Sequence, residues 1–78
     1  MDTLTRSEIR HSLTGTSLRV VERKAAVFAR WVAVCDSHGN HKARARAAVC
    51  LAECRRIAAL MGAHGWDMYL IRYDDEAR

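Results

Sequence analysis

The chain has 78 residues, of which half are hydrophobic, and it contains four glycines, no proline and a formal net charge of +4. This length predicts one small domain spanning residues 1–78, and the composition argues against a disordered or low-complexity chain. No apolar run approaches the roughly 20 residues that cross a bilayer, so we expect no membrane span. The polar segment 1–10 lacks the apolar core of a secretory signal, which predicts a cytoplasmic protein.

The first predicted element is a helix that begins near Thr5. Thr5 and Glu8 have the spacing of a capping box, in which a hydroxyl and a carboxylate accept hydrogen bonds from the backbone of the first turn. Ile9 and Leu13 follow on one helix face. Gly15, which tolerates a positive φ, is expected to end this helix.

The next segment, residues 17–35, carries conflicting signals. Its apolar residues recur at steps of three and four, as in a helix, at Leu18, Val21, Ala25, Phe28, Val32 and Cys35. The stretch VFARWVAV is rich in β-branched and aromatic residues, which favours a strand. We expect helix or extended chain over 17–26 and a strand over 27–35.

Residues 36–40, DSHGN, are turn formers, and Gly39 can supply the positive φ of a tight β-hairpin. The following residues, 41–47, alternate strictly between alanine or histidine and a basic residue. Such alternation predicts a half-buried strand with a basic face. That face carries Lys42, Arg44 and Arg46. Alanine and arginine also favour helices, so a helix that starts near His41 is the alternative.

A helix is predicted from Ala48 to Ala63, and residues 66–74 read as a strand with apolar residues on both faces. The predicted fold is therefore α+β, with an N-terminal helix, a β-hairpin, a long helix and a C-terminal strand. An all-helical bundle is the alternative. The acidic residues Asp74, Asp75 and Glu76 are expected to be solvated.

Potential zinc ligands are crowded into one stretch of the sequence. They are Cys35, His38, His41, Cys50 and Cys54. In the hairpin, the second strand runs about 20 Å away from the turn before the helix starts, so the helix thiols cannot reach the turn. In one continuous helix, His41 and Cys50 would lie about 13 Å apart. Neither arrangement gathers four ligands, so we expect no metal or other cofactor, and buried reduced thiols at Cys50 and Cys54.

Catalysis is not indicated either. Cys35 and His41 could form a thiol–imidazole pair across the predicted hairpin, but neither an oxyanion loop nor a nucleophile elbow accompanies them. The sequence therefore predicts a protein that is not an enzyme.

Positive charge is concentrated between Arg19 and Arg56. A basic middle segment is compatible with binding to nucleic acid or to an acidic protein surface. We expect a partner-binding surface that combines basic side chains with aromatic anchors. Its predicted residues are Arg30, Lys42, Arg44, Arg46, Trp66, Tyr69 and Tyr73.

The small size and the helix, hairpin, helix, strand layout resemble the small inhibitors carried by phages and mobile elements, including anti-CRISPR proteins. This resemblance implies a non-enzymatic inhibitor or adaptor in the cytoplasm of a bacterial host. It would act as a monomer or homodimer and block a nucleic-acid-handling complex such as a CRISPR effector, with direct contact to nucleic acid possible.

A second resemblance covers about 20 residues, LTRSEIRHSLTGTSLRVVER. Leu4, Thr5, Glu8, Ile9 and Leu13, followed by Ser17, Val21 and Arg23, are spaced similarly to the helix-turn-helix of bacterial regulators. The turn, residues 14–16, is one residue longer than in that pattern. The resemblance implies, as the alternative function, a DNA-binding transcriptional regulator. The residues that would approach the groove are Ser17, Arg19, Val20 and Arg23.

Overall fold

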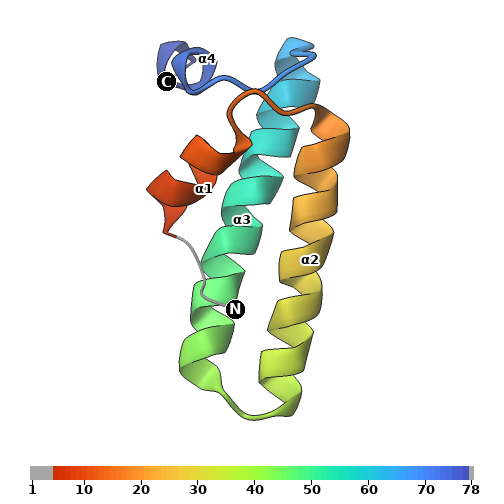
Figure 1. Ribbon diagram of the computed structural model, residues 1–78, viewed down its shortest axis with the longest axis vertical. Coiled ribbons are helices and arrows are strands. Elements are labelled where there is room, and N and C mark those ends of the chain that lie inside the picture. The colour runs from red at the N-terminus through yellow and green to blue at the C-terminus, as the bar shows by residue number, and fades with distance from the viewer. Residues whose placement is uncertain (1–4, 78) are drawn as a thin grey trace.

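The computed structural model describes residues 5–77, and within this range the chain folds into helices joined by short connections (Figure 1). The helices are α1 (Arg6–Leu13), α2 (Leu18–Ser37), α3 (His41–His64) and α4 (Ile71–Glu76). The predicted α+β fold is therefore wrong, and the all-helical alternative is correct. Helices α2 and α3 form a long antiparallel hairpin, α1 packs on α3, and α4 lies near the open end of the hairpin (Figure 1).

Helix α1 begins and ends as predicted. The Thr5 hydroxyl accepts a hydrogen bond from the Glu8 N–H at 3.2 Å, and the Glu8 carboxylate accepts one from the Thr5 N–H at 3.1 Å. These reciprocal bonds satisfy two donors at the helix start, so the capping box is confirmed. Gly15 adopts φ = 81°, a conformation that ends the helix and that few other residues tolerate.

Helix α2 includes residues 27–35, which were predicted as a strand. Val21, Phe28 and Cys35, seven residues apart, are buried along one side of this helix. The β-branched residues of this segment therefore follow the helical apolar period, because packing against α3 outweighs their intrinsic strand preference. The prediction of a strand here was wrong for this reason.

Helix α3 likewise includes residues 41–47, and the predicted basic strand is wrong. The Asn40 side chain accepts a hydrogen bond from the Ala43 N–H at 3.2 Å and so caps the helix. Gly39 adopts the expected positive φ, 68°, but its turn joins two helices instead of two strands. With the helix started at Asn40, the good helix formers alanine and arginine continue it without interruption.

The segment after α3 is not a strand. Gly65 adopts a left-handed conformation that ends α3. The Tyr69 N–H donates to the Thr16 carbonyl at 2.9 Å, and the Tyr69 carbonyl accepts from the Gly15 N–H at 2.6 Å. These two bonds make an isolated antiparallel bridge between the α1–α2 connection and the segment before α4. The bridge holds the chain so that the Tyr69 side chain enters the core.

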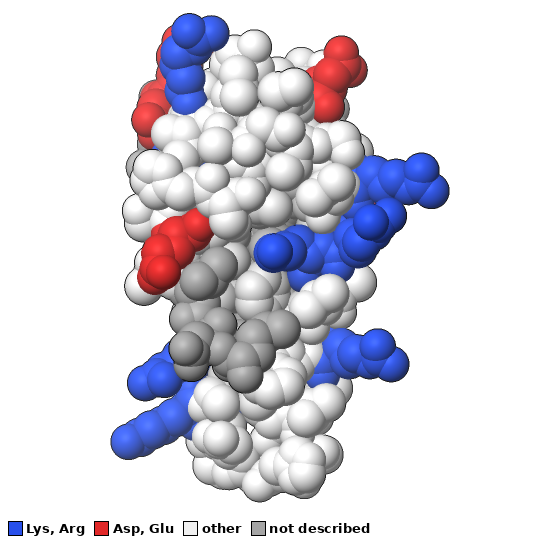
Figure 2. Space-filling model, viewed as in Figure 1, with Lys and Arg blue, Asp and Glu red and all other residues white. Residues whose placement is uncertain are grey.

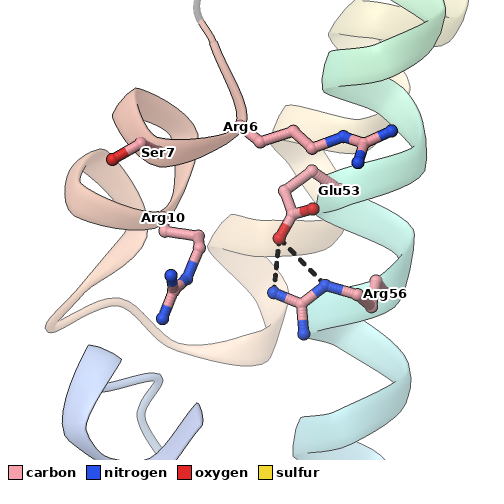
Figure 3. A pocket seen from close by; sticks show the side chains of 5 residues that line it. All are labelled: Arg6, Ser7, Arg10, Glu53 and Arg56. Carbon is pink, nitrogen blue, oxygen red and sulfur yellow. Dashed lines mark hydrogen bonds and ion pairs between the residues drawn. The ribbon is translucent and has the colours of Figure 1, made fainter. Parts of the chain in front are cut away.

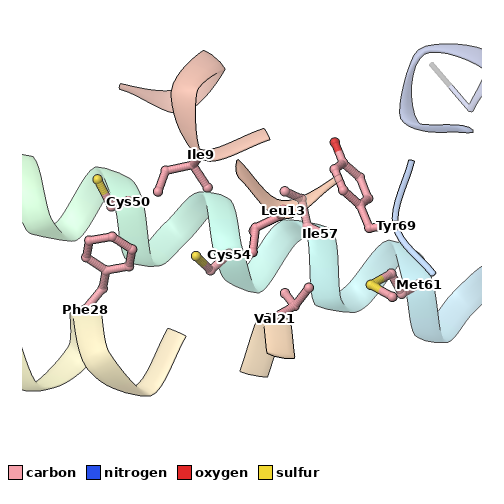
Figure 4. Close-up of a cluster of buried hydrophobic side chains, with 9 residues drawn as sticks. All are labelled: Ile9, Leu13, Val21, Phe28, Cys50, Cys54, Ile57, Met61 and Tyr69. Atoms are coloured by element: carbon pink, nitrogen blue, oxygen red, sulfur yellow. The ribbon is translucent and has the colours of Figure 1, made fainter. Parts of the chain in front are cut away.

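The core lies where α1, α2 and α3 meet (Figure 4). Phe28 of α2 lies beside Cys50 of α3, and Ile9 and Leu13 of α1 point toward α3. The buried core cluster comprises Ile9, Leu13, Val21, Phe28, Cys50, Cys54, Ile57, Met61 and Tyr69. The core thus lies in the half of the hairpin that α1 and Tyr69 cover. As a separate finding, none of the helices within residues 5–77 is long and apolar enough to cross a membrane.

Candidate binding surface

The basic residues of the segment 41–47 do not share one face. Successive residues of a helix are rotated by about 100°, so Lys42 and Arg46 share a side of α3, and Arg44 lies on roughly the opposite side. All three are exposed. The Arg44 Nε lies 3.2 Å from Asp36 Oδ1, an ion pair between two exposed groups near the α2–α3 turn. The single basic ladder expected for a strand is therefore replaced by two separate basic positions on a helix.

Helix α2 carries a second set of exposed cations. They are Arg19, Arg23, Lys24 and Arg30. Among residues 5–77, no acidic side chain forms an ion pair with any of these four. Figure 2 shows Lys and Arg side chains gathered along the edge of the molecule formed by α2, with others near the turn end of α3. Arg30, predicted as a partner-binding residue, belongs to this α2 set.

The residues of the helix-turn-helix alternative lie at the start of α2. Ser17 is the residue before the helix, and Arg19, Val20 and Arg23 are exposed on its first turns. α1 packs against α3, and α2 runs for 20 residues beside α3. The candidate groove-contacting side chains are thus accessible on a helix whose opposite side is fixed in the hairpin.

The predicted aromatic anchors have different surroundings. Tyr69 is fully buried in the core, whereas Trp66 and Tyr73 are half-buried. His64 stacks on Trp66 with ring centroids 4.9 Å apart, and Trp66 lies 5.5 Å from Tyr73. Together with Glu76 and Ala77 they line a shallow pocket of about 260 Å³. Only Trp66 and Tyr73 can therefore contact a partner without unfolding the domain.

The acidic C-terminal segment is partly buried, contrary to the expectation that it is solvated. Asp74 is completely buried and lies within a network that we call the Asp74 cluster. The members of this cluster are Arg10, Glu53, Arg56, Tyr69 and Asp74. The Tyr69 hydroxyl donates to Asp74 at 2.6 Å, and Arg10 Nε donates to the same carboxylate at 3.1 Å. The cluster connects α1, α3 and α4.

Electrostatics in the Asp74 cluster favour the charged forms of Asp74 and Arg56 and the neutral form of Tyr69. The Arg56 guanidinium holds the pKa of Asp74 well below its usual range, and the hydrogen bond from Tyr69 acts in the same direction. Asp74 and Glu53 in turn raise the pKa of Arg56. Burial, followed by the hydrogen bond to Asp74, raises the pKa of the Tyr69 phenol. A proton donor or acceptor for catalysis needs a pKa near the working pH, so these shifts fit a structural network.

A polar pocket of about 520 Å³ lies beside this cluster, between α1 and α3 (Figure 3). It is lined by Arg6, Ser7, Arg10, Glu53 and Arg56. Arg10 is paired with Asp74 and Asp75, and Arg56 with Asp74 and Glu53. Because carboxylates already occupy these guanidinium groups, the pocket offers little net positive charge to an anionic ligand.

The residues considered as metal ligands are dispersed. Cys50 and Cys54 point into the core, Cys35 is buried near the end of α2, and His38 and His41 are exposed near the turn. Within residues 5–77, no three His, Cys, Asp or Glu side chains are grouped so that they could hold a metal ion. Burial raises the pKa of the Cys54 thiol to about 11, so Cys54 is a poor nucleophile at neutral pH.

One surface feature was missed by sequence reasoning. Val20, Val27 and Val34 are exposed along α2, at 39%, 43% and 40% of their surface. Each immediately precedes a buried residue of the core-facing row. The signal that could have found them is their seven-residue spacing, which was obscured by the assignment of residues 27–35 to a strand. Compared with known proteins, the chain matches no family model, and no curated protein or solved structure is significantly similar to it.

Proposed function

We propose that the protein acts by binding and not by catalysis, as a small inhibitor or adaptor that blocks a bacterial nucleic-acid-handling complex of the CRISPR-effector kind. The observation that carries this proposal is the exposed cationic surface of the α2–α3 hairpin. Arg19, Arg23, Lys24 and Arg30 have no acidic partner among residues 5–77. A domain that keeps such charges unpaired on an elongated surface attracts an anionic partner at long range.

The sign of this charge restricts where the inhibitor docks. Proteins that handle nucleic acid bind phosphates with basic grooves, which would repel the hairpin. The hairpin therefore binds an acidic surface of the target, or the nucleic acid that the target holds, instead of imitating nucleic acid in the groove. Trp66, just after α3, and Tyr73 of α4 are both half-buried near the open end of the hairpin, and they are the aromatic residues positioned to add apolar contact.

The test is capture of a defined CRISPR effector, purified with and without its guide RNA, together with inhibition of its DNA cleavage. We expect wild type to bind and inhibit, and the Arg19→Glu, Arg23→Glu, Arg30→Glu triple variant of α2 to do neither. The control is Arg6→Glu, a charge reversal at an exposed position of α1, outside the α2–α3 hairpin. Failure of wild type to bind a panel of such effectors would contradict the proposed target class. An equal loss of binding in the Arg6 variant would contradict the assignment of binding to the hairpin surface.

A DNA-binding regulator is the second candidate, and the exposure of Arg19, Val20 and Arg23 on the first turns of α2 favours it. Phosphate contacts release counterions, so specific DNA binding that persists at about 0.15 M salt would support a regulator. Binding to random duplex DNA that disappears at this salt concentration would instead reflect net positive charge alone. If the protein is a regulator, the double variant Arg19→Ala, Arg23→Ala should lose sequence-specific DNA binding. If the binding reflects net charge alone, there is no sequence-specific binding for the variant to lose.

A further inference from the structure

Helix α2 has two parallel rows of apolar side chains. Val21, Phe28 and Cys35 face the core, and the residue before each of them forms the second row. We call this second row the valine row, and it consists of Val20, Val27 and Val34. Because successive residues differ by about 100°, the valine row lies a quarter-turn around α2 from the buried row. It is therefore a separate surface and not the exposed edge of the core.

The valine row has the dimensions of a helix-binding surface. Its ends are 14 residues apart, which corresponds to about 21 Å along the helix axis. A seven-residue spacing keeps the row facing a second helix that crosses at about 20° in a left-handed supercoil. Within residues 5–77, α2 packs mainly against α3, on its buried side. The row is thus spaced for a helix that the domain itself does not supply.

Charged and aromatic residues border the valine row on both sides. On the solvent side, Arg23 and Arg30 are exposed and are themselves seven residues apart. On the core side lie Lys24 and the half-buried Trp31. The Trp31 indole Nε1 is buried and has no hydrogen-bond partner among the described residues, although buried tryptophan N–H groups usually have one. The border therefore carries positive charge next to the apolar row, whereas the Trp31 N–H lies beneath the surface.

We infer that the valine row binds an amphipathic helix of another protein whose apolar residues recur at heptad spacing and whose flanking positions are acidic. This inference rests on the proposed binding function and specifies the chemistry of the partner. Charge complementarity favours a partner helix with acidic flanks, because Glu or Asp beside its apolar row would face Arg23, Lys24 and Arg30. A second copy of this chain is disfavoured, because pairing through the valine row would bring Arg23 and Arg30 of one copy close to Arg23 and Arg30 of the other.

The test uses a displayed library of 21-residue peptides with leucine fixed at the a and d positions of three heptads. Every e and g position varies between Glu and Lys. Selection against the full chain is expected to enrich Glu at the varied positions. Val27→Glu should weaken binding of the enriched peptide about tenfold or more, because a carboxylate would be buried against apolar and acidic groups. The matched control is Ala26→Glu, the same charge change at the neighbouring exposed position, which should change affinity less than twofold.

Three results would overturn the inference. The first is enrichment of Lys, or of neither residue. The second is equal peptide binding by wild type and Val27→Glu. Val27→Ser removes the apolar contact without adding charge, so equal binding by this variant would also count against the inference. The third is a dimer of the free protein in sedimentation equilibrium that Val27→Glu dissociates, which would assign the row to a second copy. Circular dichroism confirms that each variant is folded. A negative result here, together with inhibition of an effector by wild type, would leave the proposed function intact.

Discussion

Arg56 binds Asp74 through two hydrogen bonds, with Nη1 3.0 Å from Oδ1 and Nη2 2.8 Å from Oδ2. The same guanidinium donates from Nε to Glu53 at 2.9 Å. Asp74 is completely buried, and this pairing ties the short C-terminal helix α4 to the middle of α3. This bidentate geometry matches the planar guanidinium group to the carboxylate, and it fixes the relative orientation of the two side chains.

We expect Asp74→Asn to destabilise the protein strongly. Asparagine keeps the size of the side chain but removes the charge that faces Arg10 and Arg56, which leaves these cations poorly compensated. The loss in free energy of unfolding should be about 3 kcal/mol, measured by urea denaturation. The control is Asp75→Asn, because 59% of the Asp75 side chain is exposed. Its loss should be below about 1 kcal/mol. Similar losses for the two variants would show that Asp74 is not specially stabilising.

Stability should fall in acid because of the same carboxylate. Arg56 holds the pKa of Asp74 well below its usual range in the folded protein. In the unfolded chain this group titrates near pH 4, so its stabilisation is complete above about pH 4 and decreases as the pH falls further. The urea midpoint of wild type should therefore drop between about pH 4 and pH 2. Asp74→Asn should show a flatter profile, and parallel profiles would contradict the assignment.

The N-cap residues of α1 and α2 should differ in their sensitivity to substitution by alanine. Thr5 accepts a capping hydrogen bond from Glu8, whereas the Ser17 side chain makes no capping bond at the start of α2. Thr5→Ala should therefore lower the free energy of unfolding by about 1 kcal/mol. Ser17→Ala, at the equivalent position of the next helix, should change it by less than about 0.5 kcal/mol. A larger loss for Ser17→Ala than for Thr5→Ala would contradict the assignment of Thr5 as the residue that caps its helix through its side chain.

Cys54 should react with thiol reagents only when the protein unfolds. Burial raises the pKa of this thiol to about 11, so at pH 8 about one molecule in a thousand carries the reactive thiolate. The side chain is also inaccessible in the core. Labelling with an aromatic disulfide reagent, located by mass spectrometry, should therefore proceed at the rate of global unfolding and accelerate in urea. Rapid labelling of Cys54 under native conditions would show that the core opens locally.

The ends of the elements were more predictable than their type. The capping box at Thr5 and the positive φ of Gly15 and Gly39 follow from local chemistry and are found as expected, although the turn at Gly39 joins two helices and not two strands. The type of element in residues 27–35 and 41–47 was wrong, because both segments satisfy a helical and a strand pattern at once. A segment with two acceptable periods is decided by what it packs against, and that information is not local.

For the candidate surface too, the sequence indicates the chemistry of the residues but not their placement. Which residues are basic or aromatic can be read from the chain, but a helix rotates Arg44 away from Lys42 and Arg46, and Tyr69 enters the core. The valine row also becomes visible only after residues 18–37 are known to form one helix. The Asp74 cluster is the clearest case, because Arg10 and Asp74 are 64 residues apart in the sequence.

The sequence by itself determined the start and end of α1, the positive φ of Gly39 and the cationic character of the middle segment. These properties depend on single residues and on contacts across three or four positions. Only the tertiary structure decided that the chain is all-helical, that Asp74 is buried between two arginines, and that α2 presents a second apolar row. Each of these depends on what the segments pack against, above all on the position of α3 beside α1, α2 and α4, and the local sequence pattern alone does not determine that packing.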